Sequence, residues 1–88
     1  MSDNYQKLKK QLDLQDWPSV YFFKFIVENS PANWAKVSSL FNDGTDLRIQ
    51  PSKNGKYISI SSKELMLDVD SVLKKYNEAS LIKGLIAL

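Results

Sequence analysis

The sequence predicts an α+β fold in which a four-stranded antiparallel sheet packs against helices. The dipeptide Asn54-Gly55 lies between two runs of alternating apolar and polar residues, as is typical of a tight β-hairpin. The run from Val20 to Val27 consists almost entirely of aromatic and β-branched residues, which indicates a central strand. Amphipathic helical patterns near residues 31–42 and 69–79 alternate with the predicted strands.

A weak helical pattern covers Asp3 to Leu14. Its apolar residues share the i, i+3 and i+7 spacing of one narrow helical stripe: Tyr5, Leu8 and Leu12. The following Trp17-Pro18 ends this helix, because proline disfavours helical backbone in the residue before it. We therefore predict an N-terminal helical extension over residues 1–15 and a single domain over residues 16–88.

The predicted strand Val20 to Val27 is apolar on both faces, apart from one lysine. Because side chains alternate along a strand, Phe23 and Phe25 share one face and Phe22 and Ile26 share the other. Such a strand usually lies in the middle of a sheet, with helices on one face and something partly covering the other. We expect Phe23 and Phe25 to face the helices.

The first main helix begins at Ser30-Pro31, with serine as the N-cap and proline at the first helical position. Its apolar pattern runs to about Asn42, and Gly44 suits a left-handed C-cap. This helix is predicted to cover the sheet through its apolar side.

The hairpin is predicted to turn through a two-residue type I′ loop, in which Asn54 and Gly55 both adopt positive φ. The strand before the turn places Leu47 and Ile49 on one face by alternation. The strand after it places Ile58 and Ile60 likewise, and we expect all four on the core side.

The later half of the second hairpin strand has two possible registers. Strict alternation would place Ser62 and Glu64 on the core face, whereas a β-bulge near residues 61–63 would turn Leu65 and Leu67 inward. A carboxylate on the helix-covered face is costly without a partner, so we predict the bulge.

The second main helix is predicted over Val69 to Ala79, with Asp68 or Asp70 as its cap. An apolar strand is predicted over Leu81 to Leu88, in which Gly84 indicates a bulge or the close approach of a neighbouring side chain. The elements then read as a helix followed by β-α-β-β-α-β, which is the split βαβ, or ferredoxin-like, plan with strand order 4-1-3-2 and both main helices on one face. The predicted core consists of Phe23, Phe25, Trp34, Val37, Phe41, Leu47, Ile49, Ile58, Ile60, Val72, Leu73, Tyr76 and Ile86.

The composition limits the functions open to the chain. Its 88 residues, 43% of them hydrophobic and 25% charged, suffice for one folded domain. The absence of histidine and cysteine excludes disulfides, thiolate nucleophiles, Cys/His zinc sites and histidine general bases. We expect no catalytic residues, no metal site and no cofactor, and an enzyme that uses lysine or carboxylate groups is a minor alternative.

Charge and hydropathy bear on the partners and the location. The net charge of +2 is too small for an obvious nucleic-acid binding surface. No stretch approaches the roughly 18 apolar residues that a membrane span needs, and the N-terminal residues have no apolar signal core. We therefore expect a cytoplasmic protein with no membrane association.

Four segments between Asp16 and Leu88 carry a resemblance to a known family: Trp17-Pro18-Ser19, Lys24-Phe25-Ile26-Val27, Ser52-Lys53-Asn54-Gly55-Lys56-Tyr57 and Gly84-Leu85-Ile86-Ala87-Leu88. Together they are similar to the YbeD-like family of small bacterial proteins of unknown function, sometimes labelled lipoate-regulatory, in the form of its Bacteroidetes branch. The resemblance implies an α/β sandwich like that of regulatory ACT domains, and no catalytic residues. Ser62 and Glu64 depart from the apolar pattern expected there.

The face of the sheet without helices is the candidate binding surface, because an apolar face of this kind usually meets a partner or ligand. Its candidate residues are Phe22, Lys24, Ile26, Arg48, Lys53, Lys56 and Tyr57. We expect a non-enzymatic regulatory or binding module whose open face or sheet edge meets a protein partner, a small acidic ligand or a second copy of the chain. The alternative cover for this face is the helix over Asp3 to Leu14.

Single-stranded RNA binding is the alternative function. An RRM has the same topology and stacks bases on aromatic side chains of its two central strands. Phe22 and Tyr57 could serve in this way, but Ser59 stands where a second aromatic residue is required. Nucleic acid is therefore not the expected partner.

Overall fold

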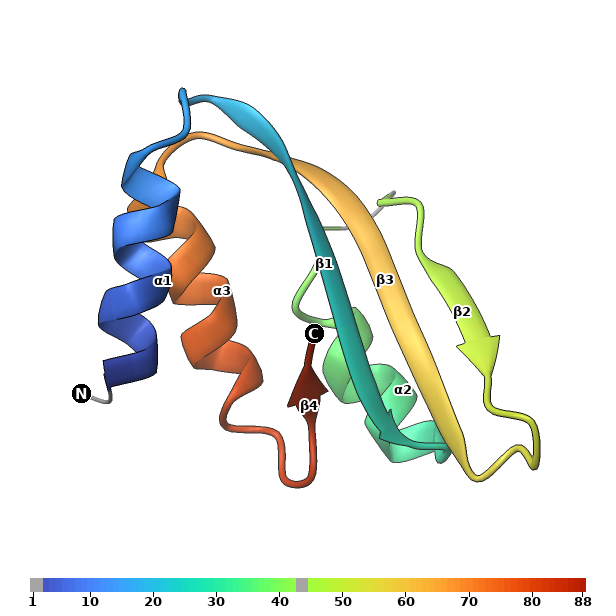
Figure 1. The fold of residues 1–88 in the computed structure, drawn as a ribbon. Helices are drawn as coiled ribbons and strands as arrows, with labels where there is room; N and C mark the ends of the chain where they lie inside the picture. Colours follow the sequence, from blue (N-terminus) through green and yellow to red (C-terminus); the bar gives the residue numbers. More distant parts are fainter. Residues whose placement is uncertain (1–2, 43–44) are drawn as a thin grey trace.

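The structure is a computed structural model that describes residues 3–42 and 45–88, with side chains from Gln6 onward. In chain order its elements are α1 (Asp3–Asp13), β1 (Ser19–Glu28), α2 (Pro31–Ser38), β2 (Arg48–Pro51), β3 (Tyr57–Met66), α3 (Val69–Ala79) and β4 (Ile86–Ala87). The strands form one antiparallel sheet in the order β2-β3-β1-β4 (Figure 1), which confirms the predicted α+β class. Counted from β4, this is the expected order 4-1-3-2.

The centre of the sheet is the long pair of β1 and β3. These strands pair over their whole length, from Ser19 opposite Met66 to Glu28 opposite Tyr57. β2 pairs with the half of β3 nearer the hairpin, and β4 pairs only with Phe25 and Ile26 of β1. The predicted hairpin pairing of β2 and β3 is confirmed.

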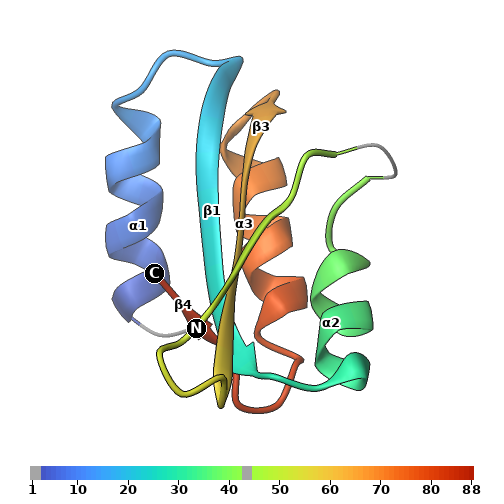
Figure 2. The ribbon, with the colours of Figure 1, turned by 90° about the vertical axis from the view of Figure 1, so that its right-hand side faces the viewer.

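Two helices, α2 and α3, lie on the same side of the strands (Figure 2). Between them and the sheet lies a core of buried apolar side chains: Leu12, Phe23, Phe25, Val27, Val37, Phe41, Ile58, Ile60, Met66, Val72 and Ala79. α1 packs beside α3, and Leu12 on it is fully buried. The Trp17 indole N–H donates a hydrogen bond of 2.9 Å to the Leu12 carbonyl oxygen, which fixes the connection from α1 to β1.

The predicted bulge in β3 is wrong. The register with β1 is continuous, so Ser62, Glu64 and Met66 face the core while Leu65 is 65% exposed and Leu67 lies outside. The carboxylate of Glu64 is accommodated because Lys75 of α3 forms an ion pair with it beneath the sheet. The partner that the bulge prediction assumed to be missing is supplied by a helix distant in sequence.

The hairpin turn is longer than the predicted two-residue type I′ loop. The Gly55 N–H donates to the Ser52 carbonyl oxygen at 2.9 Å, and the Ser52 N–H donates to the Tyr57 carbonyl oxygen at 2.8 Å. Gly55 has φ +75°, whereas Asn54 does not have positive φ. Asn54 instead stabilises the loop through its side-chain oxygen, which accepts the Lys56 N–H at 3.0 Å.

The first main helix ends four residues earlier than predicted. Ser30 caps it, accepting the Asn33 N–H at 3.1 Å, and Pro31 is its first residue, both as expected. Helical structure stops at Ser38, although Phe41 remains buried because turn hydrogen bonds continue the chain against the core. The predicted C-cap, Gly44, lies outside the described residues.

Three predicted core residues lie at the surface: Trp34, Ile49 and Ile86. The Trp34 indole N–H donates to the side-chain oxygen of Asn29 at 2.8 Å, which holds the ring at the surface. Ile49 is on the short edge strand β2, where little covers it.

The last strand is also much shorter than the predicted Leu81 to Leu88. Turn hydrogen bonds continue beyond α3, including one from the Leu85 N–H to the Ile82 carbonyl oxygen at 3.2 Å, so only Ile86 and Ala87 join the sheet. Gly84, with φ +78°, lies in this turn and not in a strand bulge.

Candidate functional site

The candidate site is the face of the sheet opposite α2 and α3, which we call the open face. The register places on it Val20, Phe22, Lys24, Ile26, Glu28, Arg48, Gln50, Tyr57, Ser59, Ser61, Lys63, Leu65 and Ile86. α1 does not cover it, since Val20 and Leu65 are each 65% exposed and Phe22 is 52% exposed. The expected alternative, a face covered by the N-terminal helix, is therefore wrong.

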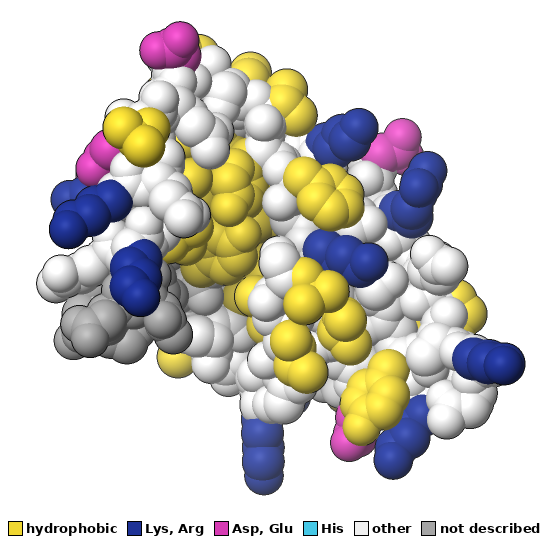
Figure 3. Space-filling view, viewed as in Figure 1, with side chains coloured by type: hydrophobic (Ala, Val, Ile, Leu, Met, Phe, Trp, Pro, Cys, Tyr) yellow, Lys and Arg dark blue, Asp and Glu magenta, His cyan; other side chains and the backbone are white. Residues whose placement is uncertain are grey.

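Apolar side chains form two groups on the open face. Val20 lies directly opposite Leu65 at one end, with Phe22 two residues further along β1. Ile26 lies directly opposite Ile86 nearer the other end. Figure 3 shows these hydrophobic side chains separated by basic ones.

Three cations lie beside the two apolar groups, with Lys63 directly opposite Phe22. Lys24 and Arg48 are the direct neighbours of Ser61 on its two sides, and Lys63 is two residues along β3. Ser61 is buried between its neighbours. In the part of the chain that the structure describes, none of these cations forms an ion pair.

The only carboxylate among the strand residues of the open face is Glu28, at the hairpin end opposite Tyr57. The face is therefore basic, although the whole chain carries a net charge of only +2. A face of this kind can accept an anionic group between its cations while apolar groups rest on either side.

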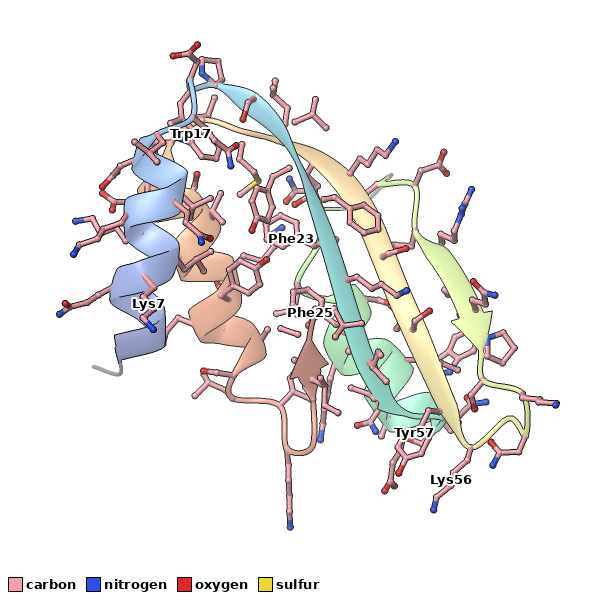
Figure 4. The ribbon with its side chains drawn as sticks, viewed as in Figure 1. Lys7, Trp17, Phe23, Phe25, Lys56 and Tyr57 are labelled. Carbon is pink, nitrogen blue, oxygen red and sulfur yellow. The ribbon has the colours of Figure 1, made fainter. Side chains whose placement is uncertain are left out.

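The predicted site residues fall into two places. Phe22, Lys24, Ile26, Arg48 and Tyr57 lie on the open face. Lys53 and Lys56 lie in the hairpin loop, at one end of the open face. The Lys56 ammonium is 5.6 Å from the Tyr57 ring centroid (Figure 4).

The candidate residues predicted from the sequence did not include Val20, Lys63, Leu65 or Ile86, which the structure places on this face. Alternation along the strand already places Val20 on the same face as Phe22. The predicted bulge near residues 61–63 included Lys63 and would have turned Leu65 toward the core. Ile86 was expected in the core, but Leu85 packs against the core instead and Ile86 lies outside, because a shift of one residue exchanges the two faces of a strand.

The two exposed aromatic residues of the open face are far apart. Phe22 lies opposite Lys63, and Tyr57 lies opposite Glu28, six residues further along β1. At about 3.3 Å per residue, this is roughly 20 Å. Adjacent bases could not stack on both rings, so the geometry does not favour an RRM-like mode of RNA binding.

Two other depressions lie outside the sheet. A groove between α1 and α3 is lined by residues of both charges, including Lys9, Lys10, Asp13 and Asp70. A second depression lies beside Trp34 on α2 and is mostly apolar. Neither brings together groups of one recognisable chemistry.

Over residues 6–42 and 45–88, no group of three or more acidic side chains is placed to hold a metal ion. Within the same ranges, no helix combines the length and hydrophobicity needed to cross a membrane. Comparison of the chain with protein-family models, with curated proteins and with solved structures gave no match.

Proposed function

We propose that this protein is a small non-enzymatic binding or regulatory module that holds an acidic protein partner on its open face. The observation that carries this proposal is the placement of Lys24, Arg48 and Lys63 next to exposed apolar side chains on an uncovered sheet face. Exposed apolar patches with polar neighbours are typical of interaction surfaces. The cations add a preference for carboxylate or phosphate groups.

An acidic partner suits this surface better than a second copy does. Two copies that met through their open faces would bring two sets of three cations together, with one glutamate on each face to offset them. Like charges brought together in an interface are costly. A small acidic ligand would pair with the cations but would leave Val20 and Leu65 exposed.

The proposal also includes a specific fold, the ferredoxin-like sandwich, and a specific family. The strand order and the position of α2 and α3 on one side are compatible with a ferredoxin-like, ACT-like sandwich. The segments around Trp17-Pro18 and Asn54-Gly55 support membership of the YbeD-like family, with a regulatory role in the cytoplasm. Function still depends on the site and not on the fold.

The experiment compares two double variants of the tagged protein. Phe22→Asp with Ile26→Asp places two carboxylates on the open face. Leu14→Asp with Leu81→Asp removes two other exposed apolar side chains, 87% and 82% exposed, outside the sheet. Proteins bound in the native host are cross-linked and identified, and sedimentation measures self-association.

We expect the open-face variant to lose partners that the wild type and the control variant retain, and to do so while folded. We expect the wild type to sediment as a monomer, and partner binding to weaken as salt rises. A folded open-face variant with the same partners as the wild type would refute the proposal.

A further inference from the structure

The sheet has an incomplete edge beside β1. β1 is ten residues long, but β4 pairs only with its Phe25 and Ile26. One more hydrogen bond, of 2.9 Å, runs from the Leu88 N–H to the Lys24 carbonyl oxygen. From Ser19 to Phe23, β1 is therefore paired on its β3 side only, within the part of the chain that the structure describes.

The free edge belongs to the backbone of Val20 and Phe22. In an antiparallel sheet, the N–H and C=O groups of successive residues face opposite neighbours. Because the Lys24 carbonyl faces β4, those of Val20 and Phe22 face the same side. No backbone hydrogen bond joins them to any other described residue on that side. Proteins usually cover or interrupt an apolar edge of this kind.

A hollow lies next to this edge. Figure 3 shows hydrophobic side chains lining it between α1 and β1, beyond the end of β4. Leu8 of α1, Tyr21 of β1 and Tyr76 of α3 are partly buried and pack against the core, and the hydroxyls of Tyr21 and Tyr76 are 2.9 Å apart. α1 lies on the other side of the hollow (Figures 1 and 2). The free edge of β1 is therefore more accessible to a single extended chain than to the edge strand of another sheet.

We propose that the free edge of β1 accepts an extended segment of a partner protein as an added strand, antiparallel to β1 and in line with β4. This inference rests on the proposed binding function and specifies how the partner is held. Strand addition at a sheet edge is a recurring mode of peptide recognition, in which the backbone supplies affinity and alternate side chains supply specificity.

The register defines the chemistry of that segment. Residues opposite Tyr21 and Phe23 lie on the core side and enter the hollow, so they are apolar. The residue opposite Phe22 lies on the open face, near Lys24 on the same strand and Lys63 on the next. An acidic residue there pairs with these cations, so the partner segment alternates apolar and acidic residues.

The probe is a short synthetic peptide of alternating valine and glutamate, compared with a valine and lysine peptide of equal length. Amide hydrogen exchange of the wild-type protein is measured by NMR with each peptide. We expect the acidic peptide to slow exchange at Val20 and Phe22 by about tenfold or more, because their N–H groups gain acceptors. Exchange at Tyr21 and Phe23, which already bond to β3, should change much less.

Two variants test the edge itself. Val20→Pro removes one N–H from the free edge, where proline is tolerated in a strand, and Val20→Ala keeps that N–H. We expect Val20→Pro to weaken peptide binding about tenfold and Val20→Ala to change it less than about threefold. If Val20→Pro fails to fold, the exchange measurement on the wild type decides.

The possible failures are distinguishable. A peptide that binds without slowing exchange at Val20 and Phe22 would overturn the added-strand inference and leave the open-face function standing. Equal binding of the lysine peptide would overturn the acidic specificity. If neither peptide binds, strand addition of this chemistry is wrong, while the open-face function is still decided by the Phe22→Asp with Ile26→Asp comparison.

Discussion

Glu64 of β3 and Lys75 of α3 form an ion pair beneath the sheet, with only 10% and 13% of their side chains exposed. The Lys75 ammonium also lies 4.6 Å from the ring centroid of Phe41 and 5.3 Å from that of Phe23. The cation is thus held by a carboxylate and by two aromatic rings. This arrangement links α3 to β3 and supplies the counter-charge that Glu64 needs on the buried face of the strand.

Removing one partner of this ion pair should destabilise the fold strongly. We expect Lys75→Met to cost about 3–5 kcal/mol, because it leaves the Glu64 carboxylate buried without a counter-charge. Lys75→Met with Glu64→Leu should recover most of that loss, since both charges are then absent. Urea unfolding measures the free energy of unfolding of both variants. A loss below about 1 kcal/mol in Lys75→Met would show that water reaches the ion pair in the folded protein.

The helix-facing aromatic residues should dominate stability. Phe25 is fully buried, so we expect Phe25→Ala to cost about 3–5 kcal/mol in urea titration. Phe22→Ala is the matched control on the other face of the same strand, and we expect it to cost less than about 1.5 kcal/mol. Equal losses at the two positions would contradict the burial difference.

The hairpin loop requires positive φ at one residue only. We expect Gly55→Val to cost about 1–2 kcal/mol, because Gly55 has φ +75° and a side chain at this backbone angle is strained. The strain comes from the backbone alone, since no atom beyond the two neighbouring residues lies within 4 Å of an added Cβ. Gly55→Asn should cost less, since asparagine tolerates this backbone region. An unchanged melting temperature in Gly55→Val would show that the loop can adopt another conformation.

Tyr76 should make stability fall at alkaline pH. Burial, together with the hydrogen bond of 2.9 Å between its hydroxyl and that of Tyr21, raises the pKa of Tyr76 well above its ordinary value of 10.0. The protonated phenol is thus favoured in the folded state. Its contribution is complete below about pH 10 and is lost as the pH rises further, because the unfolded chain releases the proton first.

Unfolding free energies measured from pH 8 to pH 11 test this expectation. Tyr76→Phe should have a shallower alkaline decline than the wild type, and Tyr57→Phe, which removes an exposed hydroxyl, should keep the wild-type profile. Parallel profiles for the wild type and Tyr76→Phe would rule out a role for this phenol.

Asp68 is the N-cap of α3, while Asp70 is inside the first turn. The Asp68 carboxylate accepts the Ser71 N–H at 2.8 Å and completes a capping box. We expect Asp68→Ala to lower the unfolding free energy by about 1 kcal/mol and Asp70→Ala to lower it by less. Thermal unfolding compares the two, and a larger effect of Asp70→Ala would contradict the assignment.

Local sequence determined the elements whose signals are complete within a few residues. Ser30-Pro31 set the start of α2, and the apolar repeat after Asp68 set α3 over Val69–Ala79 as predicted. The alternating runs around Asn54-Gly55 set the antiparallel pairing of β2 and β3. In each case the hydrogen bonds or periodicity involved lie close together along the chain, so nearby residues decide them.

Tertiary structure decided the features that depend on residues distant in sequence. The continuous register of β3 places Glu64 on the core face, where Lys75 pairs with it, and only the folded chain brings this ammonium to the carboxylate. The short β4 and the free edge of β1 follow from the turn after α3, which packs Leu85 inward and leaves Ile86 outside. Charge pairing and the length of an edge strand depend on contacts across the fold, and no local pattern contains them.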